Sequence, residues 1–320
     1  VSSPKLVDSF DIPVLVGVGG DVDVISNKLY YNSEVSNSGY FKYKGTYNGR
    51  HYFYGLEDYA EGDIICSCDE KYEDFKKHSD IPEQIDYTAC LYNGIFYNWY
   101  LYGKILYAYD LQTNKLSVLL DASDKNYGSM KIISITDGWI LSRIGTSSHS
   151  ESIMAYNIQT GETLENPCPI SCDGAVGTDG ILYGFCADEL AAYNPVKDEF
   201  TEIGGINAKS TYTNLMVDKN GDVWALDYHE QGENYTVCKV YEAKSANSVQ
   251  NYSLKSNKII NGWYYYEYEP ENSDKKYLAR LNLSTGETEY CKNIEVGNYP
   301  YYPTPYYWGK VQNKTTESEK

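Results

Sequence analysis

The hydrophobic and polar positions of this chain repeat with a period of 41–45 residues, measured between the glycines of six Asn-Gly or Asp-Gly pairs. A run of aromatic and aliphatic residues follows each pair, such as IFYNWY after the second and WYYYEY after the sixth. Type I′ turns need positive φ at both central residues, so Asn-Gly and Asp-Gly predict two-residue β-hairpins. The six pairs are Asn48-Gly49, Asn93-Gly94, Asp137-Gly138, Asp179-Gly180, Asn220-Gly221 and Asn261-Gly262.

The second half of each repeat is also regular. A hydrophobic run ends in an acidic or amide residue, and a second tight turn and a further strand follow, as in ILYAYDLQTNKLSVLL over 105–120. This second turn contains short polar sequences such as QTN and QTG, whose residues are typical of tight turns. Each repeat therefore predicts four strands in the order strand, tight turn, strand, connection, strand, tight turn, strand. This period and strand number are those of a β-propeller blade.

The ends of the chain bear on the number of blades. Six repeats cover about residues 44–293, and the segments on either side, which include VDVISNKLYY and YPYYPTPYYWG, also contain strand-forming residues. The prediction is an all-β β-propeller of seven four-stranded blades, with one blade shared between the N- and C-termini. Six or eight blades stay open as alternatives. We expect one propeller domain over 1–312 and a polar tail over 313–320.

The repeat resembles a family of bacterial secreted β-propellers. The element YD-x-x-T, seen as YDLQT from Tyr109, follows a DG-x-LY hairpin, seen as DGILY from Asp179, and both are similar to kelch-like and quinoprotein-like repeats. The resemblance covers about residues 40–293. It implies the propeller fold but no particular activity, because propellers include enzymes, receptors and scaffolds.

Composition narrows the range of partners. The chain has 45 acidic and 27 basic residues, which give a net charge of −18. We expect no nucleic-acid partner, because affinity for nucleic acid depends on Lys and Arg neutralising phosphates. We expect no membrane insertion, because no stretch approaches the roughly 20 apolar residues that span a bilayer. Since the chain begins at Val1, we expect that a leader was removed and that the protein is extracellular or on the cell surface.

Cysteine and histidine positions do not predict a cofactor or a metal. The eight cysteines fall at different points of the repeat and are interpreted as small buried hydrophobic residues, and Cys168 and Cys172 are the pair best placed to form a disulfide. The four histidines are scattered along the chain, without the paired spacing of a metal site. We therefore expect no cofactor and no metal.

The connections between the second and third strands predict where a ligand would bind. They vary in length, whereas the turns at the other end of the strands are uniformly tight, and variable loops on a rigid scaffold are usual binding sites. Aromatic rings beside amides and carboxylates suit a sugar or a peptide. The candidate binding residues are Tyr59, Trp99, Tyr100, Arg143, His149, Tyr228, His229 and Glu233.

The sequence favours a noncatalytic binding module, extracellular or on the cell surface, that holds a carbohydrate, peptide or protein partner on its loop-rich face. The alternative is a polysaccharide-acting hydrolase or lyase that uses carboxylate, Tyr or His residues in the central funnel. A purely structural interaction domain is a third hypothesis. No GxSxG turn is present to place a nucleophilic serine, and no catalytic residue is proposed, so the expectation is that the protein is not an enzyme.

Overall fold

A computed structural model describes most of the chain, and every element in its described part is a β-strand. The described residues are 3–8, 14–16, 22–24, 41–56, 63–69, 74, 76–100, 103–145, 152–170, 175–177, 179–186, 189–207, 212–217, 220–228, 235–241, 251–254, 258–260, 263–283, 285–296 and 307–308. The chain divides into two compact units. Unit 1 is Val1–Asp80 with Leu254–Lys320, and unit 2 is Ile81–Ser253.

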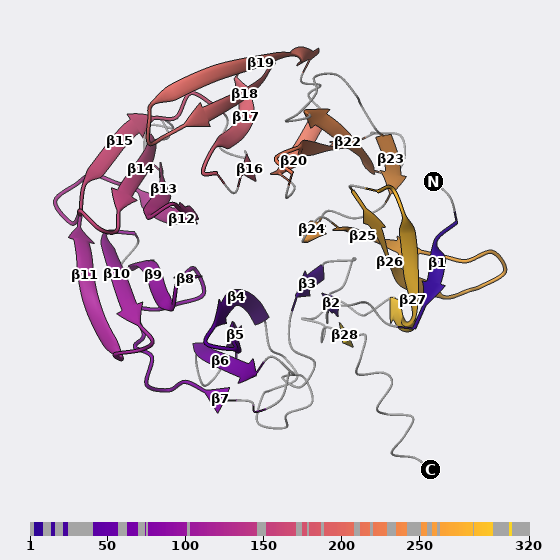
Figure 1. Ribbon diagram of the computed structural model, residues 1–320, viewed down its shortest axis with the longest axis horizontal. Helices are drawn as coiled ribbons and strands as arrows, with labels where there is room; N and C mark the ends of the chain where they lie inside the picture. The colour runs from indigo at the N-terminus through magenta and orange to yellow at the C-terminus, as the bar shows by residue number, and fades with distance from the viewer. Residues whose placement is uncertain are drawn as a thin grey trace. The chain divides into compact units, whose positions relative to one another are not determined.

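Unit 2 consists of four sheets, each with four strands. In each sheet the strands follow one another in chain order, and every recorded pairing is antiparallel. In Figure 1 the first strand of each sheet lies on the inner side of the unit and the fourth on the outer side. The first sheet contains β8 (Cys90–Tyr92), β9 (Ile95–Tyr100), β10 (Ile105–Asp110) and β11 (Lys115–Asp121). The second sheet contains β12 (Ser129–Thr136), β13 (Trp139–Gly145), β14 (Ser152–Asn157) and β15 (Thr163–Pro167). The other two are β16 (Ala175–Val176), β17 (Leu182–Cys186), β18 (Glu189–Asn194) and β19 (Glu199–Asn207), then β20 (Tyr212–Val217), β21 (Val223–Tyr228), β22 (Tyr235–Tyr241) and β23 (Asn251–Leu254).

Where the structure describes the Asn-Gly and Asp-Gly pairs, the first hairpin of the blade forms at the predicted place, but with two geometries. Between β12 and β13, Asp137 and Gly138 have φ of 49° and 78°, as a type I′ turn requires. Between β16 and β17 the hairpin is wider and takes in residues 177–181, with Gly180 at φ 78°. The prediction of a two-residue turn is wrong at this hairpin, where the pairing ends at Val176 and Leu182, and at the hairpin between β20 and β21, where the pairing ends at Val217 and Val223.

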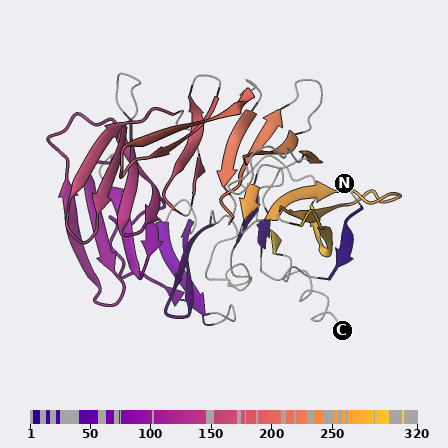
Figure 2. The same ribbon diagram turned by 45° about the horizontal axis from the view of Figure 1, so that its top comes forward.

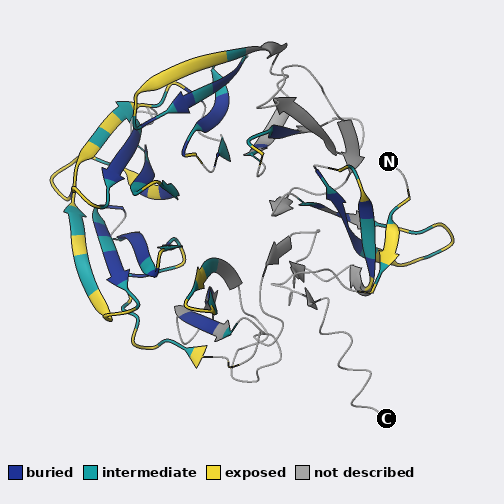
Figure 3. Cartoon of the chain, in the orientation of Figure 1, coloured by how far each residue is buried: buried dark blue, intermediate teal, exposed yellow. Residues whose placement is uncertain are grey.

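The core of unit 2 lies within the blades and between neighbouring blades. Strand β14 is buried at four consecutive positions, as expected for a strand with a sheet packed against each face, whereas the outer strand β15 alternates between exposed and half-buried. Figure 3 shows that the buried residues lie mainly on the two middle strands of the unit 2 blades, such as β13 and β14, whereas the outer strands β11 and β15 are half-buried and exposed. Leu106 of one blade and Ile140 of the next, both fully buried, belong to one continuous cluster.

Unit 1 contains one four-stranded sheet and two sheets of other sizes. The four-stranded sheet is β4 (Phe41–Tyr47), β5 (Arg50–Leu56), β6 (Asp63–Asp69) and β7 (Lys76–Lys77). A five-stranded sheet contains β24 (Lys258–Ile260), β25 (Trp263–Tyr268), β26 (Lys276–Asn282), β27 (Thr288–Val296) and β1 (Lys5–Val7). A three-stranded sheet contains β3 (Val22–Val24), β2 (Val14–Val16) and β28 (Tyr307–Trp308). The strands are seen from a second direction in Figure 2.

The prediction of seven four-stranded blades is wrong, because the described residues form five blades with four strands each. In the five-stranded sheet, β1 adds to β27 in parallel, so the N-terminal segment lengthens an existing sheet. Strand β28 pairs with β2, so strands from both ends of the chain form the small three-stranded sheet. The pair Asn261-Gly262 and the tail over 313–320 lie outside the described residues, and the single-domain assignment over 1–312 stays a prediction.

Candidate functional site

The structure describes four of the eight predicted binding residues, and each of the four lies in a strand. Trp99 and Tyr100 are the last residues of β9, Arg143 lies in β13, and Tyr228 ends β21. The strands therefore continue further than the sequence predicts, because aromatic residues fit strand ends as well as loops. The remaining four candidates, Tyr59, His149, His229 and Glu233, lie outside the described residues.

Trp99 and Tyr100 lie together beside a pocket of about 450 Å³ on unit 2. We call it the connection pocket, because it lies where the chain enters β8, leaves β9 and enters β12. Its lining consists of Asp86, Tyr87, Thr88, Trp99, Tyr100, Gly103, Ser129 and Met130. The pocket lies at the end of the strands where the sequence predicts binding, and its volume is in the range of small-ligand sites.

The two predicted aromatic residues have different roles in the pocket wall. Trp99 is only 5% exposed, and its indole Nε1 donates a hydrogen bond of 2.8 Å to Ser142 Oγ in the neighbouring blade. Tyr100 is half-buried, and its ring meets that of Tyr107 edge to face with centroids 6.2 Å apart. Trp99 therefore joins two blades, whereas Tyr100 offers a ring held in place by its neighbour.

One rim of the connection pocket is the segment 81–89, which precedes β8. Asp86 Oδ1 accepts hydrogen bonds from the backbone N–H and the hydroxyl of Thr88, at 2.7 and 2.6 Å. Thr88 Oγ1 also lies 2.7 Å from Asn98 Oδ1, and Asn98 Nδ2 donates to Gln84 O at 2.6 Å. Asn98 is fully buried in β9. This rim network, formed by Gln84, Asp86, Thr88 and Asn98, fixes the rim before any ligand arrives.

Gly103 brings the connection after β9 close to the next blade. A Cβ at this position would lie 2.2 Å from Met130 N, and its φ is 79°. Only glycine fits both the close approach and the left-handed backbone. The pocket wall at Gly103 and Met130 is therefore backbone of two adjacent blades.

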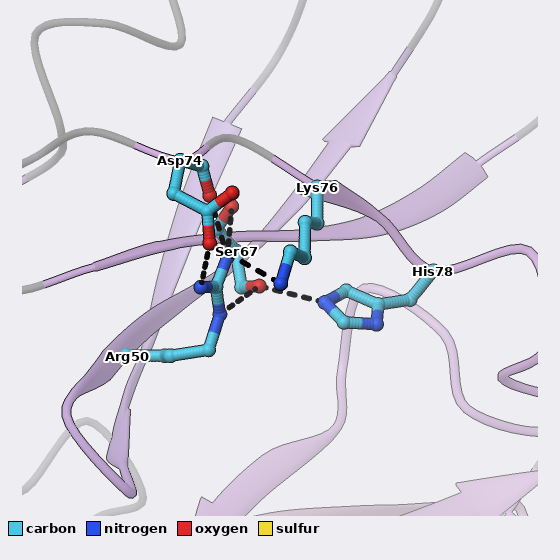
Figure 4. A network of polar contacts seen from close by, with 5 residues as sticks. All are labelled: Arg50, Ser67, Asp74, Lys76 and His78. Carbon is cyan, nitrogen blue, oxygen red and sulfur yellow. Dashed lines mark hydrogen bonds and ion pairs between the residues drawn. The ribbon is translucent and has the colours of Figure 1, made fainter.

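A second polar network lies in unit 1, around Ser67 of β6 (Figure 4). Arg50 Nε donates to Ser67 Oγ at 2.9 Å, and Ser67 Oγ lies 2.7 Å from His78 Nε2. Since the serine oxygen accepts from Arg50, its hydrogen is available for His78 Nε2, and the ring then carries a hydrogen on Nδ1, 3.9 Å from Asp80. Arg50 also bonds Asp74 through Oδ2 at 2.8 Å and through its carbonyl oxygen at 2.6 Å.

This Ser–His pair has the residue types of a nucleophile and its base, but not the exposure. Ser67 is fully buried, so no substrate carbonyl can reach its hydroxyl. Burial lowers the pKa of His78, which keeps the ring neutral, and hydrogen bonds from Arg50 and then Lys76 lower the pKa of Asp74. The Ser67 network, formed by Arg50, Ser67, Asp74 and His78, therefore holds β5 and β6 to the segment around β7.

Within the part of the chain that the structure describes, no group of three or more His, Cys, Asp or Glu side chains is placed to hold a metal ion. Cys66 and Cys291 are fully buried, as a small hydrophobic residue would be. A disulfide between Cys168 and Cys172 stays a prediction, because Cys172 lies outside the described residues. No described helix is long and apolar enough to cross a membrane.

Most of the connection pocket could not be predicted from the repeat. Asp86, Tyr87 and Thr88 come from an insertion before the first strand of a blade, and Ser129 and Met130 begin the next blade. One signal was available, since the segment DYTA over 86–89 combines an exposed aromatic residue with an Asp two positions before Thr, which is typical of a turn held by the Asp side chain.

Comparison with known proteins supports the fold and no family. A scan against models of protein families found no match, and a search of curated proteins also found none. Solved structures do match. A prolyl endopeptidase structure is 11% identical with a TM-score of 0.53, and a post-proline cleaving enzyme from Rickettsia typhi is 12% identical with a TM-score of 0.50. The β-propeller domain of the trilobed protease from Pyrococcus furiosus is 14% identical with a TM-score of 0.48.

The coverage of these matches is unequal. The matched part is 89% of this chain but 46% and 48% of the two peptidase chains, so this chain spans about half of their length. For the Pyrococcus domain the matched parts are 79% of this chain and 82% of that chain. Repeated four-stranded antiparallel sheets in chain order are propeller blades. The chain has an all-β, β-propeller fold.

Proposed function

We propose that this protein is a noncatalytic binding module that holds a carbohydrate, peptide or protein partner at the connection pocket of unit 2. The observation that carries the proposal is the combination of aromatic side chains with polar groups already fixed by the rim network. Tyr87 is 52% exposed and lies beside the half-buried Tyr100. Aromatic rings with convergent polar groups are the usual lining of a ligand site.

The chemistry of the connection pocket favours binding over catalysis. Asp86 is its one carboxylate among the described lining residues, whereas a glycosidase needs two on opposite sides of the scissile bond. Asp86 Oδ1 is also occupied by Thr88. The polysaccharide hydrolase or lyase is therefore the less favoured hypothesis. The proposed location remains extracellular or on the cell surface, on the grounds of the sequence resemblance and the acidic composition.

The test is retention of the labelled protein on an array of immobilised glycans and peptides, comparing wild type with Tyr87→Ala. We expect Tyr87→Ala to raise the Kd for the retained partner by about tenfold or more, because an exposed ring at the centre of a contact contributes most of its energy. Phe200→Ala is the matched control, since Phe200 is an exposed aromatic residue, 44% accessible, outside the pocket.

Three results would contradict the proposal. These are an unchanged Kd in Tyr87→Ala, an equal loss in Phe200→Ala, and no partner retained by wild type. Incubation of a retained glycan with the protein provides a second readout, and we expect no new reducing ends or unsaturated products. Their appearance would favour the enzyme hypothesis.

A further inference from the structure

Two grooves on the other end of the unit 2 strands are lined by equivalent positions of successive repeats. The first groove, about 430 Å³, lies between the blade of β8–β11 and the blade of β12–β15. The second groove, about 330 Å³, lies between the latter and the blade of β16–β19. Four residues of the first groove have an equivalent in the second groove, one repeat later along the chain. With the first-groove residue named first, the pairs are Asn93 with Asp137, Ile95 with Trp139, Asp137 with Asp179, and Asn157 with Asn194.

Strand direction places both grooves on the face opposite the connection pocket. The grooves are built from the tight turns after the first and third strands of each blade, as at Asp137-Gly138 and Asn157-Ile158. The connection pocket is built from the chain before the first strand and after the second. In an antiparallel sheet these two sets of connections lie at opposite ends of the strands. The grooves are therefore a separate site from that of the proposed function.

The second groove has one acceptor and one donor fixed by the turns that form it. In the second groove Asp179 Oδ1 accepts from Ile181 N at 3.1 Å, which leaves Oδ2 as an acceptor. Asn194 Oδ1 accepts from the backbone N–H groups of Val196 and Lys197, which leaves Nδ2 as the donor. Asn157 is held in the same way in the first groove, by the N–H of Gln159 at 2.9 Å.

The walls of the grooves add a half-buried ring to these polar groups. In the second groove the ring is Trp139, and in the first it is Tyr92. A ring beside a carboxylate acceptor and an amide donor suits a sugar, whose CH face stacks on the ring while neighbouring hydroxyls donate and accept. Asp137 lines both grooves and connects them into one track.

We propose that the two grooves are consecutive subsites for a neutral oligosaccharide, with one sugar ring in each. The repeat supplies the reason for an oligomeric ligand, because equivalent positions one blade apart offer a carboxylate, Asp137 or Asp179, and an amide, Asn157 or Asn194, to successive sugar units. The reason for a neutral ligand is charge, since Asp137 and Asp179 would repel the carboxylate of an acidic sugar. The inference goes beyond the proposed function, because it needs neither Tyr87 nor the rim network.

The test is isothermal titration of the full chain with cellohexaose, xylohexaose, mannohexaose and maltohexaose. We expect at least one hexasaccharide to bind, and Asp137→Asn to raise its Kd by about tenfold or more, because Asp137 serves both subsites and a charged acceptor is lost. Asn tolerates the left-handed φ of 49° at this position, so the turn is retained. Asp179→Asn, which alters only the second groove, is expected to weaken binding less.

Asp121→Asn is the control, because Asp121 is an exposed carboxylate at the end of β11 that lines neither groove. The proposal is overturned if none of the four sugars binds, if Asp137→Asn leaves the Kd unchanged, or if Asp121→Asn weakens binding equally. Binding of hexalysine in place of the sugars would overturn it too. Loss of sugar binding in Tyr87→Ala but not in Asp137→Asn would assign the sugar to the connection pocket, and so separates this inference from the proposed function.

Discussion

The Ser67 network in unit 1 and the rim network in unit 2 are alike in construction and opposite in access. Each contains one fully buried polar residue, Ser67 in the first and Asn98 in the second. Each holds a connection beside its sheet by hydrogen bonds of 2.6–2.9 Å. The difference is that the rim network borders a pocket of about 450 Å³, whereas the Ser67 hydroxyl is closed off from solvent.

This comparison shows that residue type alone is a poor guide to function in a propeller. The Ser67 network contains the types that suggest a hydrolase, a serine and a histidine at 2.7 Å, yet its serine is inaccessible. The rim network contains only amides, a hydroxyl and a carboxylate, yet it borders the pocket where we propose that a partner binds. Access to solvent decides which of two similar networks can bind a partner.

The largest effect is expected from removing Arg50. Arg50→Ala removes the donor to Ser67 Oγ and leaves two backbone carbonyls without it, so we expect a loss of about 2–3 kcal/mol in the free energy of unfolding, measured with urea. Lys76→Ala is the control, because Lys76 is an exposed cation that contacts the same carboxylate of Asp74, and we expect it to change stability little. Equal losses in the two variants would show that the Ser67 contact is unimportant.

A smaller loss, of about 2 kcal/mol, is expected for Asn98→Ala, which leaves the carbonyl oxygen of the half-buried Gln84 without its donor. Partner retention, measured on the same samples, distinguishes the two networks. Asn98→Ala should weaken retention because the rim loses its support, whereas Arg50→Ala should retain the partner as wild type does. Weaker retention in Arg50→Ala alone would reverse the roles of the two networks.

The smallest effect is a pH dependence that arises from His78. Because burial lowers its pKa in the folded state, the unfolded chain binds this proton first as the pH falls below about 6.5, and stability decreases with it. A single proton can contribute at most about 1.4 kcal/mol per pH unit. In His78→Gln, unfolding measured between pH 7 and 5 should therefore show a shallower decline than in wild type. Identical slopes would mean that His78 does not titrate differently on folding.

The parts of the fold that depend on local chemistry could be predicted from the sequence. Asn93-Gly94 and Asp137-Gly138 form the expected hairpins, with positive φ at all four residues, because this turn is determined by two residues and no distant contact. The predicted number of four-stranded blades was wrong, because that number depends on which distant strands pair, such as β1 with β27. Pairing between the ends of the chain leaves no periodic signal in the sequence.

The candidate site could be predicted only in part, and for a similar reason. Trp99 and Tyr100 belong to the repeat and were found, but their exposure depends on how the next blade packs, which the sequence does not reveal. Asp86, Tyr87 and Thr88 belong to no repeat position. Their role becomes visible only when Asn98 holds the segment against β9.

Amide hydrogen exchange of the wild-type protein, with and without the partner retained on the array, tests most directly whether the partner binds at the connection pocket. We expect the partner to slow exchange at residues 84–89 and 129–130, around the connection pocket, and to leave residues 66–69 and 76–78 of the Ser67 network unchanged. Slower exchange at 66–69 and 76–78, with 84–89 unaffected, would contradict it.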